Sequence, residues 1–148
     1  RDIVKALTAR GMNISIPLAQ RTDPSIASSI VPLAISHMGG NATGGFSTNA
    51  ELGAYIEFGT GLPGDSGQIA NGQERNPKAA GFSYTLETTI RTGKYAGHTR
   101  KGWVYHNGSR FVHTLGQPAR PFMYPAQLIL EEEAEPIARA VIRDNIEG

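Results

Sequence analysis

Frequent glycine and proline residues limit the length of the regular elements that this chain can form. The 148 residues include 18 glycines and 9 prolines. Glycine favours turns with positive φ angles, and proline removes a backbone donor, so both interrupt helices and strands. The sequence therefore predicts a loop-rich fold built from short elements.

Length and composition exclude several classes of protein. A chain of 148 residues suits one domain, and we expect residues 1–148 to form it. Without any cysteine, the chain cannot form a disulfide framework, a thiol nucleophile or a cysteine-ligated zinc site. No apolar run approaches the roughly 18 residues of a transmembrane helix, and the first residues lack the pattern of a signal peptide. We therefore expect a cytosolic chain with no membrane partner.

Charge is unevenly distributed along the chain. The net charge of +1 is too small to indicate bulk binding of nucleic acid or membrane. Residues 72–120, however, carry eight basic side chains and two acidic ones, whereas residues 121–148 carry six acidic and two basic ones. Such segregation suits a subunit that stacks on others, although a solvated surface gives the same pattern.

The first part of the sequence predicts short elements. Apolar residues at helical spacing before Gly11 predict a helix that ends at that glycine. Asp23 and Pro24 are typical of a helix N-cap and first turn, so a short helix is expected over residues 24–29. Alternating apolar residues then predict a half-buried strand over residues 31–35.

A hairpin and a second short helix are expected next. Residues 39–41 have turn composition, and residues 44–48 can form the return strand, although glycines weaken it. Apolar spacing predicts a helix over residues 51–58, with Gly59 as its C-terminal cap. Residues 60–81 show no periodicity, so we expect a long glycine-rich loop or arm there.

The remaining elements are a strand, a hairpin and a long helix. Residues 82–90 alternate and predict a strand. Residues 103–112 predict a hairpin that turns at Asn107-Gly108, because Asn-Gly favours a type I′ turn. One apolar stripe predicts a helix that starts near Pro125 and is kinked at Pro136. The sum is an α+β fold with a small antiparallel sheet, hairpins, short helices and a long C-terminal helix.

Two short motifs suggest enzymes, but neither has the required context. Residues 64–67 read Gly-Asp-Ser-Gly, as around the nucleophile of chymotrypsin-like proteases, and a hydrolase would need a histidine base near Ser66. The same residues are ordinary turn formers. Residues 59–64 match G-x-G-x-x-G, yet no helix is expected directly after them. The four histidines are dispersed. We expect no catalytic residue, metal or cofactor, and a small serine hydrolase is the weaker alternative.

Aromatic residues near cations suggest a second alternative. A stacking surface for nucleic acid needs aromatic rings beside basic groups. The basic 72–120 segment offers Trp103, Tyr105, Phe111, Arg100, Lys101 and Arg110. Aromatic residues in hairpins more often pack in a core or an interface, so nucleic-acid binding stays an alternative.

Two segments carry a more specific pattern. Residues 54–61 read Ala-Tyr-Ile-Glu-Phe-Gly-Thr-Gly, and residues 118–126 read Pro-Ala-Arg-Pro-Phe-Met-Tyr-Pro-Ala. In this order they resemble the head-tail joining or tail-completion proteins of the neck of long-tailed bacteriophages. That family typically has Tyr-Ala-x-x-Val-Glu-Phe-Gly-Thr, then Pro-Phe-Leu-x-Pro-Ala opening the last helix. Here Gly53-Ala54 precedes or occupies part of the family's usual pair of small residues in the first segment. Met123 replaces the family's leucine in the second segment.

The resemblance implies a structural virion protein without an active site. Such proteins form rings, expected here to be hexameric, between the head connector and the tail. Their partners are other neck or connector proteins, the tail terminator and the tail tube, with genome DNA passing through the lumen. Assembly would take place in the cytoplasm of the host bacterium. The arm at residues 60–81 would be ordered by neighbouring subunits.

Nine residues are expected to serve as interface or structural residues. They are Tyr55, Glu57, Phe58, Gly59, Trp103, Arg120, Pro121, Phe122 and Pro125. The simpler interpretation is that they are core and capping residues. Glu57 and Arg120 are each flanked by residues expected to pack, so we expect the two charges to pair within a subunit or across the ring. The alternative is that both face solvent.

Overall fold

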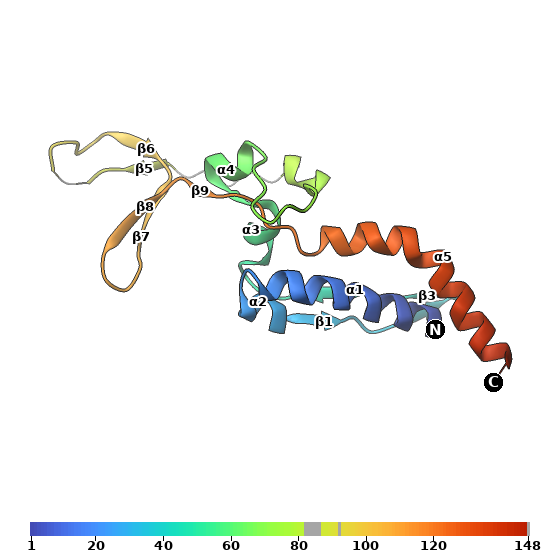
Figure 1. Ribbon diagram of the computed structural model, residues 1–148. Helices are drawn as coiled ribbons and strands as arrows, with labels where there is room; N and C mark the ends of the chain where they lie inside the picture. The colour runs from blue at the N-terminus through green and yellow to red at the C-terminus, as the bar shows by residue number, and fades with distance from the viewer. Residues whose placement is uncertain (82–86, 92, 148) are drawn as a thin grey trace. The chain divides into compact units, whose positions relative to one another are not determined.

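A computed structural model describes residues 1–81, 87–91 and 93–147 (Figure 1). The chain divides into two compact units, here called unit 1 (Arg1–Gly53 and Phe122–Gly148) and unit 2 (Ala54–Pro121). A single domain over residues 1–148 therefore stays a prediction, and each unit is described by itself.

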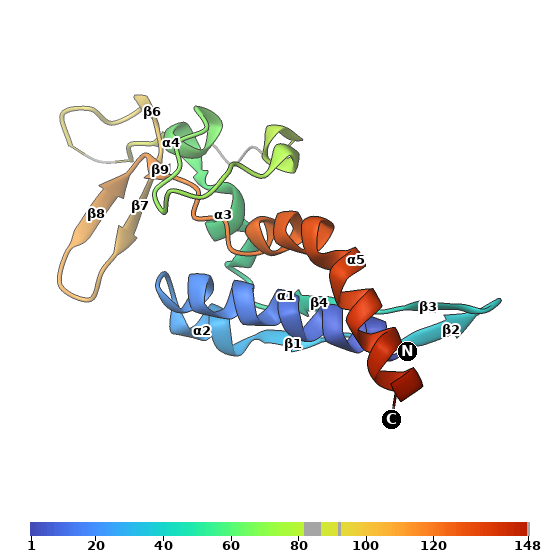
Figure 2. The ribbon, with the colours of Figure 1, turned by 45° about the vertical axis from the view of Figure 1, so that its right-hand side comes forward.

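Unit 1 combines two long helices, one short helix and four short strands. Its elements are α1 (Asp2–Gln20), α2 (Pro24–Ser28), β1 (Ile30–Pro32), β2 (Ser36–Met38), β3 (Asn41–Thr43), β4 (Phe46–Thr48) and α5 (Tyr124–Glu147). Helix α1 packs against α5, α2 and β1, and Figures 1 and 2 both show α1 and α5 side by side. The buried apolar residues are Ala19, Ile26, Ala27, Ile30, Phe122 and Ala126.

Unit 2 consists of short helical turns and hairpins. Its elements are α3 (Gly53–Phe58, whose first residue belongs to unit 1), α4 (Gly61–Asp65), the 3-10 helix η1 (Pro77–Gly81), β5 (Glu87–Thr89), β6 (Thr99–Lys101), β7 (Trp103–His106), β8 (Phe111–Thr114) and β9 (Gly116–Gln117). The expected strand over residues 82–90 is described only as β5, and residues 82–86 lie outside the described part.

The α+β class is confirmed, with helices and small antiparallel sheets. The described strands form four two-stranded sheets, β1–β4, β2–β3, β5–β6 and β7–β8. Figure 2 shows the β2–β3 hairpin beside the start of α1. The predicted strand over residues 31–35 is only partly present, because β1 ends at Pro32 and residues 33–35 belong to no strand. Strand β1 pairs with β4, and the separate strand β2 pairs with β3.

The expected helix end at Gly11 is wrong, because α1 continues to Gln20. Gly11 lies inside the helix and is buried. A Cβ atom there would overlap the Phe46 ring and approach Leu130 Cδ1 to 2.9 Å. The glycine is therefore required by close packing of α1 on β4 and α5, and not by a cap.

Other local predictions are confirmed. The Asp23 carboxylate accepts a hydrogen bond from the Ser25 backbone N–H at 2.8 Å and caps α2. Gly59 follows α3 with φ +77°. The long last helix is present, with Pro136 inside it, and Figure 1 shows α5 changing direction along its length.

The β7–β8 hairpin is also confirmed, but its turn differs from the predicted one. His106 pairs with Phe111, so the loop contains residues 107–110. A type I′ turn requires a positive φ at both central residues. Gly108 has φ +97°, but the φ of Asn107 is not positive, so the turn is not of type I′. The Asn107 side-chain oxygen instead accepts hydrogen bonds from the backbone N–H groups of Ser109 and Arg110.

Candidate functional site

The two segments that carry the family-like pattern meet through their backbones in unit 2. The Arg120 N–H donates to the Ile56 carbonyl oxygen at 2.8 Å. Thr60 and Gly61 form isolated antiparallel bridges with Gln117 and Gly116. Residues 56–61 and 116–120 are thus paired although they are separated widely in sequence.

Glycine permits this pairing. Gly59 has φ +77°, and a Cβ atom there would lie 2.7 Å from Ala119 N and 2.9 Å from the Gln117 oxygen. At Gly61 and Gly116, which also have positive φ, a Cβ atom would overlap the carbonyl of Leu115 or Thr60. Gly59 is therefore both the cap of α3 and one of three glycines that permit the close approach of the two segments.

The segment expected to be an irregular arm is hydrogen-bonded to residues 119–121. Ala119 donates to the Gln68 carbonyl at 2.8 Å, and Ala70 donates to the Ala119 carbonyl at 2.9 Å. The Asn71 side chain donates to the Pro121 carbonyl at 2.9 Å. Together with α4 and η1, these bonds give residues 60–81 a defined structure within unit 2. The predicted long glycine-rich loop or arm stays a prediction, with two short helical turns, α4 and η1, within it.

Glu57 is a buried residue, with 5% of its surface exposed. Its Oε1 accepts a hydrogen bond from the Asn76 side-chain amide at 3.0 Å. The Arg120 guanidinium lies 3.5 Å from the Gln117 side-chain oxygen. Within the described part of the chain no ion pair joins Glu57 to Arg120. Pairing inside one subunit is therefore wrong, and pairing across a ring stays a prediction.

Asn71 and Asn76 are absent from the expected site residues. Both precede residues that favour turns, Gly72 and Pro77, and Asn-Gly and Asn-Pro are turn signals. That signal marks a turn, but it does not say which distant group the amide contacts. Their partners, Pro121 and Glu57, become evident only in the folded chain.

The other expected site residues lie in packed positions. Pro121 and Phe122 are fully buried, Phe122 with 1% exposed surface, and Pro125 is buried at the start of α5. Tyr55 and Phe58 on α3 are half-buried. Trp103 is half-buried at the start of β7, opposite Thr114. These positions are compatible with a role in the core, and the role in an interface stays a prediction.

The structure adds no support for the serine-hydrolase motif or for a histidine metal site among the described residues. The Ser66 hydroxyl donates to the Pro63 carbonyl at 3.1 Å, at the end of α4. His113 lies opposite Val104 and His106 opposite Phe111, so the sheet register does not pair the two histidines. Across the described residues no group of three or more histidine, aspartate or glutamate side chains could hold a metal ion.

A basic surface follows the β5–β6 and β7–β8 hairpins. The two hairpins adjoin at the buried Gly102, whose carbonyl accepts a hydrogen bond from the Thr88 hydroxyl at 2.6 Å. The stretch from Thr88 to Leu130 contains no aspartate or glutamate. The exposed basic side chains are those of Arg91, Lys94, Arg100, Lys101 and Arg110.

An exposed aromatic ring accompanies these cations. The Lys94 ammonium lies 5.6 Å from the centroid of the Tyr95 ring, and Tyr95 is 58% exposed. Cations and an exposed ring are the groups that bind phosphates and stack on bases. This surface is the one described feature that favours the nucleic-acid alternative.

None of the helices in the described ranges has the length and apolarity needed to cross a lipid bilayer. Comparison of the chain with known proteins finds no matching family model, no matching curated protein and no matching solved structure.

Proposed function

We propose that the protein is a structural virion component of the phage neck, forming a ring that joins the head connector to the tail. The observation that carries the proposal is the backbone pairing of the two family-like segments, through Arg120 and Ile56 at 2.8 Å. A shared role of the two segments requires that they lie together in the folded chain, and their pairing meets that requirement.

The charge distribution supports assembly from identical copies. Residues 72–120 are basic and residues 121–148 are acidic. A closed ring requires a heterologous interface, in which different patches of one subunit meet head to tail. Opposite charges on separate segments of one chain suit such an interface. The proposed partners are further copies of the chain, other neck or connector proteins, the tail terminator and the tail tube, and the proposed location is the virion.

The proposal is tested by particle completion. Phage particles assembled without the protein should accumulate as separate heads and tails, and the purified chain should restore joined particles. If Arg120 meets a neighbouring subunit, Arg120→Ala should leave a folded chain that restores few particles. Arg21→Ala, at an exposed residue outside both charged segments, is the control and should restore them normally. Normal joining without the protein would contradict the proposal.

Nucleic-acid binding is the second candidate. The excess of basic side chains on the two hairpins favours it, although Glu87 lies opposite Lys101 in the β5–β6 pair. Binding through Lys and Arg contacts to phosphates should weaken steeply with salt. The combined variant Arg100→Gln/Lys101→Gln should flatten that salt dependence for a mixed-sequence DNA duplex. Tight DNA binding by a chain that is not required for particle joining would favour this candidate over the neck protein.

A further inference from the structure

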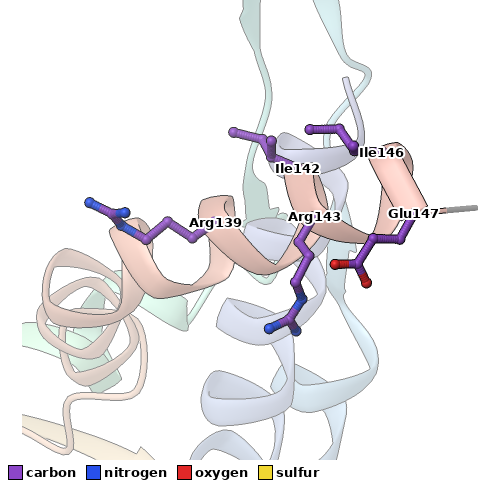
Figure 3. A pocket seen from close by; sticks show the side chains of 5 residues that line it. All are labelled: Arg139, Ile142, Arg143, Ile146 and Glu147. Atoms are coloured by element: carbon purple, nitrogen blue, oxygen red, sulfur yellow. The ribbon is translucent and has the colours of Figure 1, made fainter.

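The last turns of α5 carry two isoleucine side chains that the rest of the described chain leaves exposed. Ile142 is 50% and Ile146 is 78% exposed. Residues four apart lie on one face of a helix, and Figure 3 shows both isoleucines projecting from the same side of α5. Arg143 and Glu147 project from another side of the same turns. The end of α5 is therefore an apolar ridge with the charged side chains of Arg139, Arg143 and Glu147 beside it.

This ridge borders an incomplete pocket. A hollow of about 450 Å³ is lined by Arg139, Ile142, Arg143, Ile146 and Glu147. All of these residues belong to α5, so the hollow has a wall on one side only. A second surface is needed to enclose it and to remove the isoleucines from water.

Unit 1 also contains a groove that such a ridge can enter. A hollow of about 240 Å³ lies between α1 and the segment that follows β1. Its apolar lining includes Ala9 and Met12 from α1 and Leu33 and Ile35 from the segment after β1, and Lys5 lies at one end. Leu33 is 49% exposed. The ridge and the groove share no residue.

We infer that the α5 ridge of one copy docks in the α1–Leu33 groove of the next copy. Charge complementarity favours this occupant. Lys5 lies 3.7 Å from Asp2, one turn earlier in α1, and Arg143 and Glu147 are one turn apart in α5. Arg143 already lies 3.8 Å from Asp144 in the same turn, so the complementary pair across the contact is Glu147 of the ridge with the next copy's Lys5 in the groove.

Because ridge and groove are different patches of one unit, the contact is heterologous and repeats from copy to copy.

The docking rests on unit 1 alone, whereas closure into a ring rests on the proposed neck function. Because the chain has no cysteine, any disulfide that forms must join the introduced cysteines. Ile146→Cys and Leu33→Cys are made in separate full-length chains, mixed and oxidised. A disulfide requires Cβ atoms about 3.5–4.5 Å apart.

The expected result is a covalent heterodimer at least tenfold more abundant than in the control mixture. That control combines Ile146→Cys with Leu52→Cys, because Leu52 is also exposed and lies outside the groove. The double variant Leu33→Cys/Ile146→Cys should give a ladder of covalent multimers. Glu147→Lys should reduce the crosslink, and Lys5→Glu in the partner chain should restore it.

Two results would overturn the docking. One is a covalent homodimer of the Ile146→Cys chain as the main product, which indicates a symmetric pairing of ridges. The other is a yield no higher than that of the Leu52→Cys mixture. If rings form without the crosslink between positions 33 and 146, the docking is wrong and the neck function stands. If the crosslink forms but particles join without the protein, the docking stands and the neck function is wrong.

Discussion

Arg10 on α1 and Glu133 on α5 form a two-point ion pair in unit 1. The Arg10 Nε donates to Glu133 Oε2 at 2.6 Å, and Nη2 donates to Oε1 at 2.8 Å. The hydrogen bonds from Arg10 hold the pKa of the Glu133 carboxyl below its usual range, and the Glu133 carboxylate raises the pKa of Arg10. The pair joins two helices that are far apart in the sequence.

This pair should make unit 1 sensitive to acid. A carboxyl whose pKa is lowered by folding stabilises the native state above its unfolded pKa and loses that contribution as pH falls through the folded pKa. The Glu133 contribution is therefore complete at neutral pH and is lost below about pH 4. Glu133→Gln should lower Tm slightly at neutral pH and should reduce the fall in Tm between pH 6 and pH 3.

The effect should remain small because both groups are solvent-accessible, and salt should weaken it. Glu135→Gln is the control, because Glu135 pairs with Arg139 inside α5 and joins no second helix. An equal change in the acid dependence of Tm for both variants would contradict a special role of the Arg10–Glu133 pair.

Gly11 should not tolerate even one added methyl group. Alanine normally stabilises a helix interior relative to glycine, but a Cβ atom at Gly11 would overlap the Phe46 ring. Overpacking of this kind lowers the free energy of unfolding by about 1–3 kcal/mol. Gly11→Ala should show this loss in urea unfolding, and Phe46→Leu in the same chain should recover part of it.

Gly45→Ala is the matched control for Gly11→Ala. A Cβ atom at Gly45 would have no neighbour within 4 Å, and Gly45 does not have a positive φ. The control should therefore unfold at nearly the same urea concentration as the parent chain. A stabilised Gly11→Ala chain would show that α1 and β4 are not packed as described.

Predictions that depend on local sequence are the most accurate. Asp23-Pro24 predicts the start of α2, because an N-cap is formed by the side chain of a residue next to the helix. Asn107-Gly108 predicts the position of the β7–β8 hairpin. It does not predict the conformation of the turn, because the Asn107 side chain contacts the backbone of Ser109 and Arg110 and the loop is longer.

Predictions that depend on distant contacts are less accurate. The local sequence around Gly11 indicates a helix cap, because its neighbours Phe46 and Leu130 are remote in sequence. The order in residues 60–81 has no local signal, because it comes from hydrogen bonds to Ala119 and Pro121. Only the folded chain shows which glycines permit a turn and which permit close packing.

Gly59 should be more sensitive to substitution than other glycines with positive φ. Gly59→Ala combines a disfavoured φ with close approaches to Ala119 and Gln117. Gly72 has φ +69° and no atom within 4 Å of an added Cβ. Gly72→Ala should therefore cost only about 1–2 kcal/mol of strain. Gly59→Ala should cost clearly more in chemical unfolding, and equal losses would contradict the close pairing of residues 56–61 with residues 116–120.

Asn76 should hold residues 60–81 in place through the buried Glu57 carboxylate. Asn76→Ala removes the amide that donates to Glu57 at 3.0 Å. Loss of a partner for a buried polar group costs about 1–3 kcal/mol, and the segment should become more accessible to protease. Limited proteolysis with mass analysis of the fragments should show faster cleavage within residues 60–81.

Gln73→Ala is the control for Asn76→Ala, because the described Gln73 contact is a backbone donation to the Asn71 side chain. Cleavage in this variant should match that of the parent chain. If Asn76→Ala is cleaved no faster than Gln73→Ala, the Asn76–Glu57 hydrogen bond does not hold the segment.

We expect copies of this chain to assemble head to tail into a closed ring. Native mass spectrometry of the full chain at high concentration, with projection images of the same sample and of assembled particles, tests this assembly. The expected result is one discrete multimer, a hexamer, and a ring of that symmetry in projection at the neck. A chain that stays monomeric at high concentration and in the assembled particle would contradict it.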